Sequence, residues 1–184
     1  MIQGNWLLLI SNRWKTALEG LTISATNPGF KELVRSPVLL LAFGFGSGLS
    51  PKAPGTMGTI AAVPLWLLLA HLSQPMSLLI ILISAIAGIA ICGAAAEKLG
   101  VHDHGGIVWD EFVGYWITMT FLPLSYVSMF IGFVLFRIFD ILKPWPISWL
   151  DKKVSGELGI MLDDVVAGLA AGGCGWLLYW WMLS

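Results

Sequence analysis

The chain has few charged residues, and this shortage argues against an ordinary soluble domain. Charged residues make up 11% of its 184 residues and apolar residues make up 57%, whereas a soluble domain usually has about 25% charged residues. A large core cannot account for the difference, because a chain of this length still has too much surface to cover. The composition therefore indicates a protein embedded in the hydrocarbon of a lipid bilayer.

Cysteines and basic runs are also scarce. The two cysteines, Cys92 and Cys174, both lie in apolar stretches, which argues against a disulfide framework and gives no zinc-binding spacing. Lysines and arginines form no basic run, so nucleic acid is not expected as a partner. The expected partner is the lipid bilayer.

Three stretches contain no Asp, Glu, Lys or Arg: Ala53–Ala96, Phe112–Phe136 and Val165–Ser184. Ser73-Gln74-Pro75 divides the first stretch and Pro123 divides the second, so two helical hairpins and a final single helix are expected. The expected spans are Thr59–Leu72, Met76–Ala96, Ile107–Leu122, Tyr126–Leu142 and Val165–Leu183. The predicted fold class is all-α, a polytopic membrane helical bundle of about five spans. Within the Gly- and Pro-rich region, Val38–Gly48 is a candidate for a further, re-entrant element.

These spans place every lysine and arginine from Lys52 onward on one side of the membrane. Both hairpins return the chain to that side, and the opposite turns, His71–Met76 and Phe121–Tyr126, carry no Asp, Glu, Lys or Arg. The positive-inside rule makes the charged side the cytoplasm. We expect residues 1–36 to be a cytoplasmic or interfacial segment and residues 37–184 to be the membrane-embedded domain.

The acidic residues are concentrated on the same face. All of them except Glu19 and Glu32 lie between Glu97 and Asp164. Ionisable residues at membrane depth are costly and usually functional, and converging carboxylates suit a hard cation such as Mg²⁺. The candidate metal ligands are Asp110, Glu111, Asp140, Asp163 and Asp164, and the candidate catalytic residues are Asp110, Glu111, Asp140 and Asp164.

Adjacent residues of a helix point about 100° apart. We therefore expect one residue of each acidic pair, Asp110-Glu111 and Asp163-Asp164, to bind the metal, while its neighbour supports it or acts as a base. Asp163 and Asp164 also have a purely structural explanation, since acidic residues at the start of a helix complement its dipole.

Arg137, Asp140 and Lys143 follow one another at intervals of three, a spacing that places them on one helix face. Pro144 and Pro146 then end the helix. One interpretation is a ladder of local ion pairs. The other is a carboxylate metal ligand between two cations that bind phosphate, Arg with two hydrogen bonds and Lys as a point charge.

The Gly- and Pro-rich loop over residues 44–59 precedes a helix, and its backbone amides could hold a phosphate at the helix N-terminus. Lys52, Gly55 and Thr56 are its candidate substrate-binding residues. A simple turn between membrane segments explains the loop equally well, and the Gly-Lys-Ser/Thr of a Walker A loop is absent. His102-Asp103-His104 has the composition of a metal cluster, but three consecutive residues rarely converge on one ion, so a flexible interfacial loop is expected there.

Four blocks of the sequence resemble the phosphatidylglycerophosphatase A family, in that family's order: Gly46–Thr59 (GSGLSPKAPGTMGT), Val101–Gly114 (VHDHGGIVWDEFVG), Phe136–Ile147 (FRIFDILKPWPI) and Leu158–Gly168 (LGIMLDDVVAG). The resemblance extends from about Ser36 to the C-terminus. It implies a Mg²⁺-dependent lipid phosphatase of the bacterial inner membrane. This enzyme would convert phosphatidylglycerophosphate to phosphatidylglycerol and inorganic phosphate in phospholipid biosynthesis. The sequence departs from the family at Gly156-Glu157, where paired glycines are usual.

Alternatives remain open at this point. Metal-activated water could attack phosphorus directly, or a carboxylate could attack first and form an acyl-phosphate; we favour water, because no single Asp has the setting of a dedicated nucleophile. The Cys-x₅-Arg, Asp-x-Asp-x-Thr and Ser-Gly-His motifs of other phosphatases are absent. A transporter would need charges at several depths, and a CDP-alcohol phosphotransferase would need an Asp-Gly-x-x-Ala-Arg motif, which is also absent.

Overall fold

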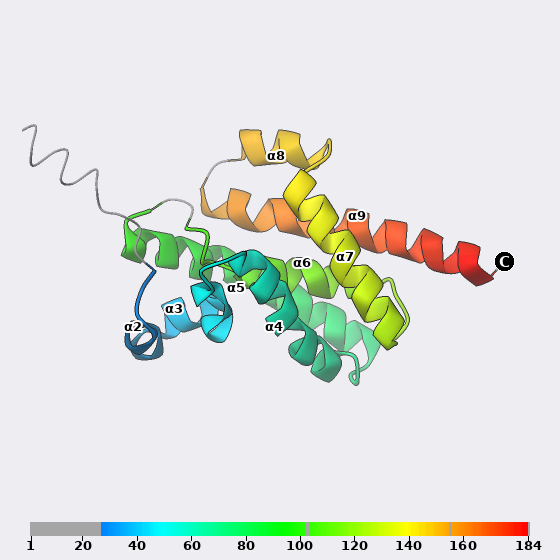
Figure 1. The fold of residues 1–184 in the computed structure, drawn as a ribbon, viewed down its shortest axis with the longest axis horizontal. Helices are drawn as coiled ribbons and strands as arrows, with labels where there is room; N and C mark the ends of the chain where they lie inside the picture. Colours follow the sequence, from blue (N-terminus) through cyan, green and yellow to red (C-terminus); the bar gives the residue numbers. More distant parts are fainter. Residues whose placement is uncertain (1–26, 102–103, 155, 184) are drawn as a thin grey trace, which may run out of the picture.

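The computed structural model describes residues 27–101, 104–154 and 156–183. Within these ranges the chain is helical and contains no strand, which confirms the all-α prediction (Figure 1). The elements are α2 (Phe30–Arg35), α3 (Pro37–Ala42), the 3-10 helix η1 (Gly44–Leu49), α4 (Pro54–Leu69), α5 (Gln74–Leu99), α6 (Trp109–Met119), α7 (Tyr126–Leu142), α8 (Ile147–Lys153) and α9 (Glu157–Leu183).

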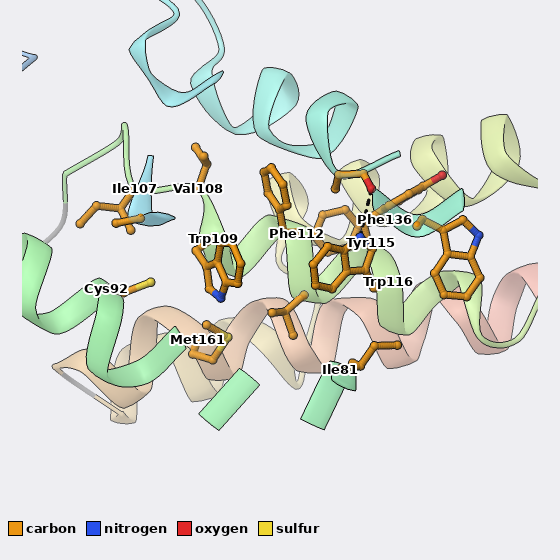
Figure 2. Packing of buried hydrophobic residues seen from close by; sticks show 14 of the residues in the cluster. Ile81, Cys92, Ile107, Val108, Trp109, Phe112, Tyr115, Trp116, Phe136 and Met161 are labelled. Atoms are coloured by element: carbon orange, nitrogen blue, oxygen red, sulfur yellow. Dashed lines mark hydrogen bonds between the residues drawn. The ribbon is translucent and has the colours of Figure 1, made fainter. Parts of the chain in front are cut away.

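Helix α6 is the centre of the bundle, because it packs against α4, α5, α7 and α9. Its aromatic side chains fill the core: the Trp109 ring stacks on Phe112 with centroids 5.7 Å apart, and Trp116 meets Phe112 edge-on (Figure 2). The indole N–H of Trp109 donates to the Ser84 carbonyl of α5 at 3.2 Å, and that of Trp116 donates to the Ala62 carbonyl of α4 at 3.0 Å. The rings are therefore buried without leaving their polar atoms unpaired.

Glycines bring α6 and α9 into direct backbone contact. A side chain at Gly168 would collide with the Gly114 carbonyl, and its Cβ would lie 3.2 Å from the Gly114 Cα. Thr118 Oγ1 donates at the same place to the carbonyls of Gly114, at 3.0 Å, and Gly168, at 3.2 Å. This crossing fixes the start of α6 against the N-terminal half of α9.

The expected start of the last helix at Val165 is wrong. Helix α9 begins at Glu157, because the helical pattern continues on the N-terminal side of the acidic pair, where Met161 is buried in the core. Asp163 and Asp164 consequently lie in the second turn rather than at the helix start. The helix dipole therefore does not explain Asp163 and Asp164, since its effect is confined to the first turn.

The expected pairs of consecutive helices are present as α4–α5 and α6–α7, and α7 has the expected bounds. Helices α6 and α7 pack against each other, whereas α4 and α5 both pack against α6 and not against each other along their length. Among the described residues, α5 and the Glu157–Met182 part of α9 are long and apolar enough to cross a membrane, while α4 is a shorter apolar helix. These helices are compatible with membrane association, and the count of five spans stays a prediction.

The candidate re-entrant segment consists of two short helical pieces. Helix α3 ends at Ala42 and η1 follows after Phe43, with left-handed backbone at Gly44, Phe45 and Gly46. Helix α2 packs against α3 and η1. The earlier part of the predicted N-terminal segment, residues 1–26, lies outside the described residues, and re-entry itself stays a prediction.

Candidate metal and phosphate site

Three carboxylates meet between the central helix and α9. Asp110 and Glu111 come from the first turn of α6, and Asp164 comes from the second turn of α9. A ligand oxygen from each can be chosen so that all three lie within 4.8 Å of one another, and Asp164 is only 3% exposed. Asp110 and Asp164 are buried and Glu111 is partly buried, and three acidic groups at this separation repel one another unless a cation or protons neutralise them. Oxygen ligands of this kind suit a hard divalent cation.

Both members of the first acidic pair reach the cluster, although their positions on the helix differ by about 100°. The backbone N–H of Glu111 donates to Asp110 Oδ1 at 3.1 Å, and the longer Glu111 side chain extends toward α4 and α7. The two residues of the second acidic pair, Asp163-Asp164, have different neighbours. Asp164 belongs to the cluster, while Asp163 Oδ2 lies 2.5 Å from Lys143 Nζ.

Arg137 of α7 adds positive charge beside the cluster. Its Nη1 lies 3.7 Å from Glu111 Oε1 and forms an ion pair with Asp140, three residues further along the helix. The expected pairing of Arg137 with Asp140 across one turn is therefore present. The Asp140 carboxyl is also an electrostatic neighbour of Asp164, so the acidic group on α7 adjoins the cluster without being one of its three converging residues.

Lys143 does not lie on the expected common helix face with Arg137 and Asp140. Helix α7 ends at Leu142, and Lys143 caps it in the left-handed conformation with φ 41°. The change of backbone direction turns its ammonium group toward Asp163 of α9. A period of three predicts a common face only while the helix lasts, and here the helix ends one residue too early.

The N-terminus of α4 closes the other side of the site. A Cβ at Gly55 would collide with Glu111 Oε1 and would lie 3.1 Å from Arg137 Nη1, so only glycine lets the α4 backbone approach this pair. Thr56 follows on the helix and is half-buried, while Lys52 lies exposed in the preceding loop. The positive end of the α4 dipole is thus directed at the same space as Arg137, an arrangement that favours an anion.

Two buried polar atoms at the centre of this arrangement are unsatisfied. Glu111 Oε2 and Arg137 Nε have no hydrogen-bond partner among the described residues. Leaving buried polar atoms unpaired is costly, and a carboxylate oxygen and a guanidinium N–H are the groups that bind a cation and a phosphate respectively. The residues present therefore fit a divalent cation bound next to a phosphate group.

The cluster lies some way along the long helices and not at their ends. Helix α9 begins at Glu157, about 10 Å before Asp164 at 1.5 Å per residue. Trp109, beside Asp110, packs against Gly88 of α5, about 16 Å before that helix ends at Leu99. Figure 1 shows the C-terminal part of α5 extending past the start of α6.

His104 lies apart from the carboxylate cluster. It is buried, its Nδ1 accepts a hydrogen bond from the Gly106 N–H at 3.0 Å, and its ring packs 5.4 Å from that of Phe43. The side chain therefore holds the loop before α6. His102 and Asp103 lie outside the described residues.

Sequence reasoning missed Cys92 as a neighbour of the site. This cysteine is fully buried in α5 and is an electrostatic neighbour of Asp110, Glu111 and Asp164. Nothing in an apolar helix distinguishes such a residue from other small core residues, so no signal in the sequence pointed to it.

Comparisons with known proteins give one family for most of the chain. The family model of phosphatidylglycerophosphatase A matches residues 40–179, a range that contains every candidate site residue. A protein of Escherichia coli K12 named phosphatidylglycerophosphatase A is 48% identical over 153 residues, which are 79% of this chain and 89% of that protein. A protein of the same name from Haemophilus influenzae is 42% identical over 163 residues, which are 88% of this chain and the whole of that protein.

A third relative carries a different name. A putative phosphatidylinositol-3-phosphatase of Bacteroides thetaiotaomicron is 37% identical over 139 residues, which are 71% of this chain and 86% of that protein. No solved structure matches the chain. From the family match and these identities, the chain belongs to the phosphatidylglycerophosphatase A family of phosphatases.

Proposed function

We propose that this protein is a Mg²⁺-dependent lipid phosphatase. It would hydrolyse phosphatidylglycerophosphate to phosphatidylglycerol and inorganic phosphate, as a step of phospholipid biosynthesis. The observation that carries the proposal is the convergence of Asp110, Glu111 and Asp164 beside Arg137. The names of the two most similar relatives reported above support this substrate.

Of the three converging carboxylates, Asp110 and Asp164 would hold the Mg²⁺, and Glu111 beside them would face the attacking water. When bound there, Mg²⁺ supplies positive charge that stabilises the charge developing on the phosphoryl group in the transition state. Asp140 and Asp163 each pair with a cation in the structure. We assign them to positioning Arg137 and Lys143 at the edge of the same site.

Arg137 would orient the phosphate. Its planar guanidinium can grip two phosphate oxygens, and its Nε is a buried donor without a hydrogen-bond partner among the described residues. The free amides at the start of α4, those of Gly55 and Thr56, face the same space and would bind a further oxygen. Lys52, in the exposed loop before this helix, would meet the outer part of the headgroup.

Water would attack phosphorus directly. Glu111 Oε2 is a buried carboxylate oxygen without a hydrogen-bond partner, so it can take the proton of the attacking water as a general base. The bond between phosphorus and the glycerol oxygen breaks, and the lipid leaves as an alcohol after taking up a proton. Arg137 and the α4 amides hold the phosphate in line during this step.

The site would lie at the cytoplasmic face of the bacterial inner membrane, in a multi-pass protein of about five spans. Two features support this placement: the long apolar helices α5 and α9, and the confinement of all cations from Lys52 onward to one end of the expected hairpins. The cytoplasmic assignment follows from the positive-inside rule.

The function is tested by phosphate release from phosphatidylglycerophosphate by purified protein in detergent. We expect release with Mg²⁺, loss of release after complete chelation, and recovery when Mg²⁺ or Mn²⁺ is restored, since Mn²⁺ accepts similar oxygen ligands. Phosphatidylinositol 3-phosphate, the substrate class named for the Bacteroides relative, serves as the comparison. Full activity after rigorous metal removal would contradict the carboxylate site, and no release from either lipid would favour a transporter.

A further inference from the structure

The short helix α8 has one packed face and one face that combines tryptophan with lysine. Ile147 is 1% exposed, and α8 packs against α9. The exposed residues of this segment, here called the Trp–Lys face, are Trp145, which comes just before the helix, and Trp149, Lys152 and Lys153 on it. Trp145 is 80% exposed and Trp149 is 49% exposed.

Three members of the Trp–Lys face share one side of α8. Lys152 and Lys153 follow Trp149 at the three- and four-residue spacings that share a helix face. Lys153 Nζ lies 4.8 Å above the centre of the Trp149 ring, and both lysines are exposed. The Lys153 stem thus lies along the Trp149 ring while its charge stays accessible.

The preceding helix also carries exposed apolar residues. Ile138, Ile141 and Leu142 of α7, here called the α7 row, are all exposed, and Leu142 comes three residues before Trp145 in the chain. Under the proposed membrane location, the α7 row contacts acyl chains. The next residues along the chain then lie at the level of the lipid headgroups, where tryptophan is enriched. Lysines at this level are attracted to anionic lipids.

We propose that the Trp–Lys face is a docking surface for an anionic phospholipid bilayer surface. The face lies in the chain between Lys143, which pairs with Asp163, and α9, whose second turn carries Asp164. Docking α8 on the headgroups holds both ends of this segment and so stabilises the α7–α9 side of the site. The inference rests on the proposed membrane location, but lipid docking itself needs neither substrate nor Mg²⁺.

The test is hydrogen–deuterium exchange of residues 145–153 in full-length protein. The protein is placed in nanodiscs of phosphatidylcholine alone or of phosphatidylcholine with phosphatidylglycerol. We expect slower exchange in the anionic nanodiscs, by about fivefold for each lysine, the factor typical of a basic residue at an anionic bilayer surface. The K152Q/K153Q double variant should lose this difference, and the K152R/K153R variant should keep it.

A matched pair of tryptophans tests the aromatic part of the face. Trp145→Ser should speed exchange of residues 145–153 in both lipids. Trp181→Ser, at the opposite end of α9 and 77% exposed, should leave that exchange unchanged. Exchange of α5 and α9 in each variant reports whether the bundle remains folded.

Equal exchange of residues 145–153 in the two lipid compositions would overturn the proposal. If protection of residues 145–153 from exchange rises with protein concentration in both lipids, the face binds a second copy of the chain and the proposal is wrong. The experiment also separates this proposal from the proposed function. If residues 145–153 show lipid-dependent protection but the protein releases no phosphate, the docking surface stands and only the proposed enzyme activity is wrong.

Discussion

Arg137 and Asp140 are one helical turn apart, and their ion pair lies where Glu111 and the start of α4 also meet. The sequence predicted this pair because the spacing of three needs only an unbroken helix, and α7 is unbroken at this point. It could not predict the Lys143 contact, because Lys143 already belongs to the left-handed cap. The contact with Asp163 depends on how α9 packs.

Replacing Asp140 by Asn removes the charge that aligns Arg137 while keeping the side chain's size. We expect kcat for phosphate release to fall by about 100-fold, a typical effect of removing a preorganised electrostatic contact at an active site. Arg137→Lys keeps the charge but loses the planar fork, so it should reduce kcat/KM comparably. Both are measured on equal amounts of monodisperse protein.

The control for these variants is Glu32→Gln on α2, where the side chain is exposed and far along the chain from the site. It should behave like the unchanged protein. Near-normal turnover in both Asp140→Asn and Arg137→Lys would show that the pair is structural and that the active site lies elsewhere.

Gly55→Ala tests the close approach of α4 to the acidic cluster. The added methyl group would displace Glu111 or Arg137, so we expect kcat/KM to fall at least tenfold, together with a loss of stability of about 1–3 kcal/mol from overpacking. Gly105→Ala is the matched control, because no atom lies within 4 Å of a Cβ at that glycine. Equal activity in the two variants would mean that the contact between α4 and Glu111 does not matter for catalysis.

At the scale of helices, apolar runs predicted the element types but not all of their limits. The bounds of α7 were correct because Ser125 caps its start and the prolines after Lys143 prevent its continuation. The predicted start of α9 at Val165 is wrong because the helix does not begin after its acidic pair but at Glu157. A helix can instead continue through acidic residues when they face a shared site, as Asp164 does.

The glycine crossing of α6 and α9 should be sensitive to one methyl group. Gly168→Ala forces the two backbones apart, so we expect the free energy of unfolding to fall by about 1–3 kcal/mol. Gly173→Ala on the same helix meets no atom within 4 Å and should leave stability nearly unchanged. Thermal unfolding in detergent measures both, and an equal Tm for the two variants would contradict the close crossing.

At the scale of the whole molecule, charge distribution predicts the orientation in the membrane. Ser73→Cys should react with an impermeant thiol reagent from outside intact cells, and Asp151→Cys should react only after the cells are opened. The unchanged protein, with Cys92 buried and Cys174 half-buried, gives the background. Labelling of Asp151→Cys from outside would show that the predicted orientation is wrong.

Helix α9 begins about 10 Å before Asp164 along its axis, so a phosphate bound to the carboxylates has to be carried past the first turn of this helix. A phosphoserine on a folded protein has a short side chain, whereas the phosphate of a lipid is carried on a slender, flexible glycerol. We therefore expect purified protein to release phosphate from the lipid ester faster than from a folded phosphoprotein.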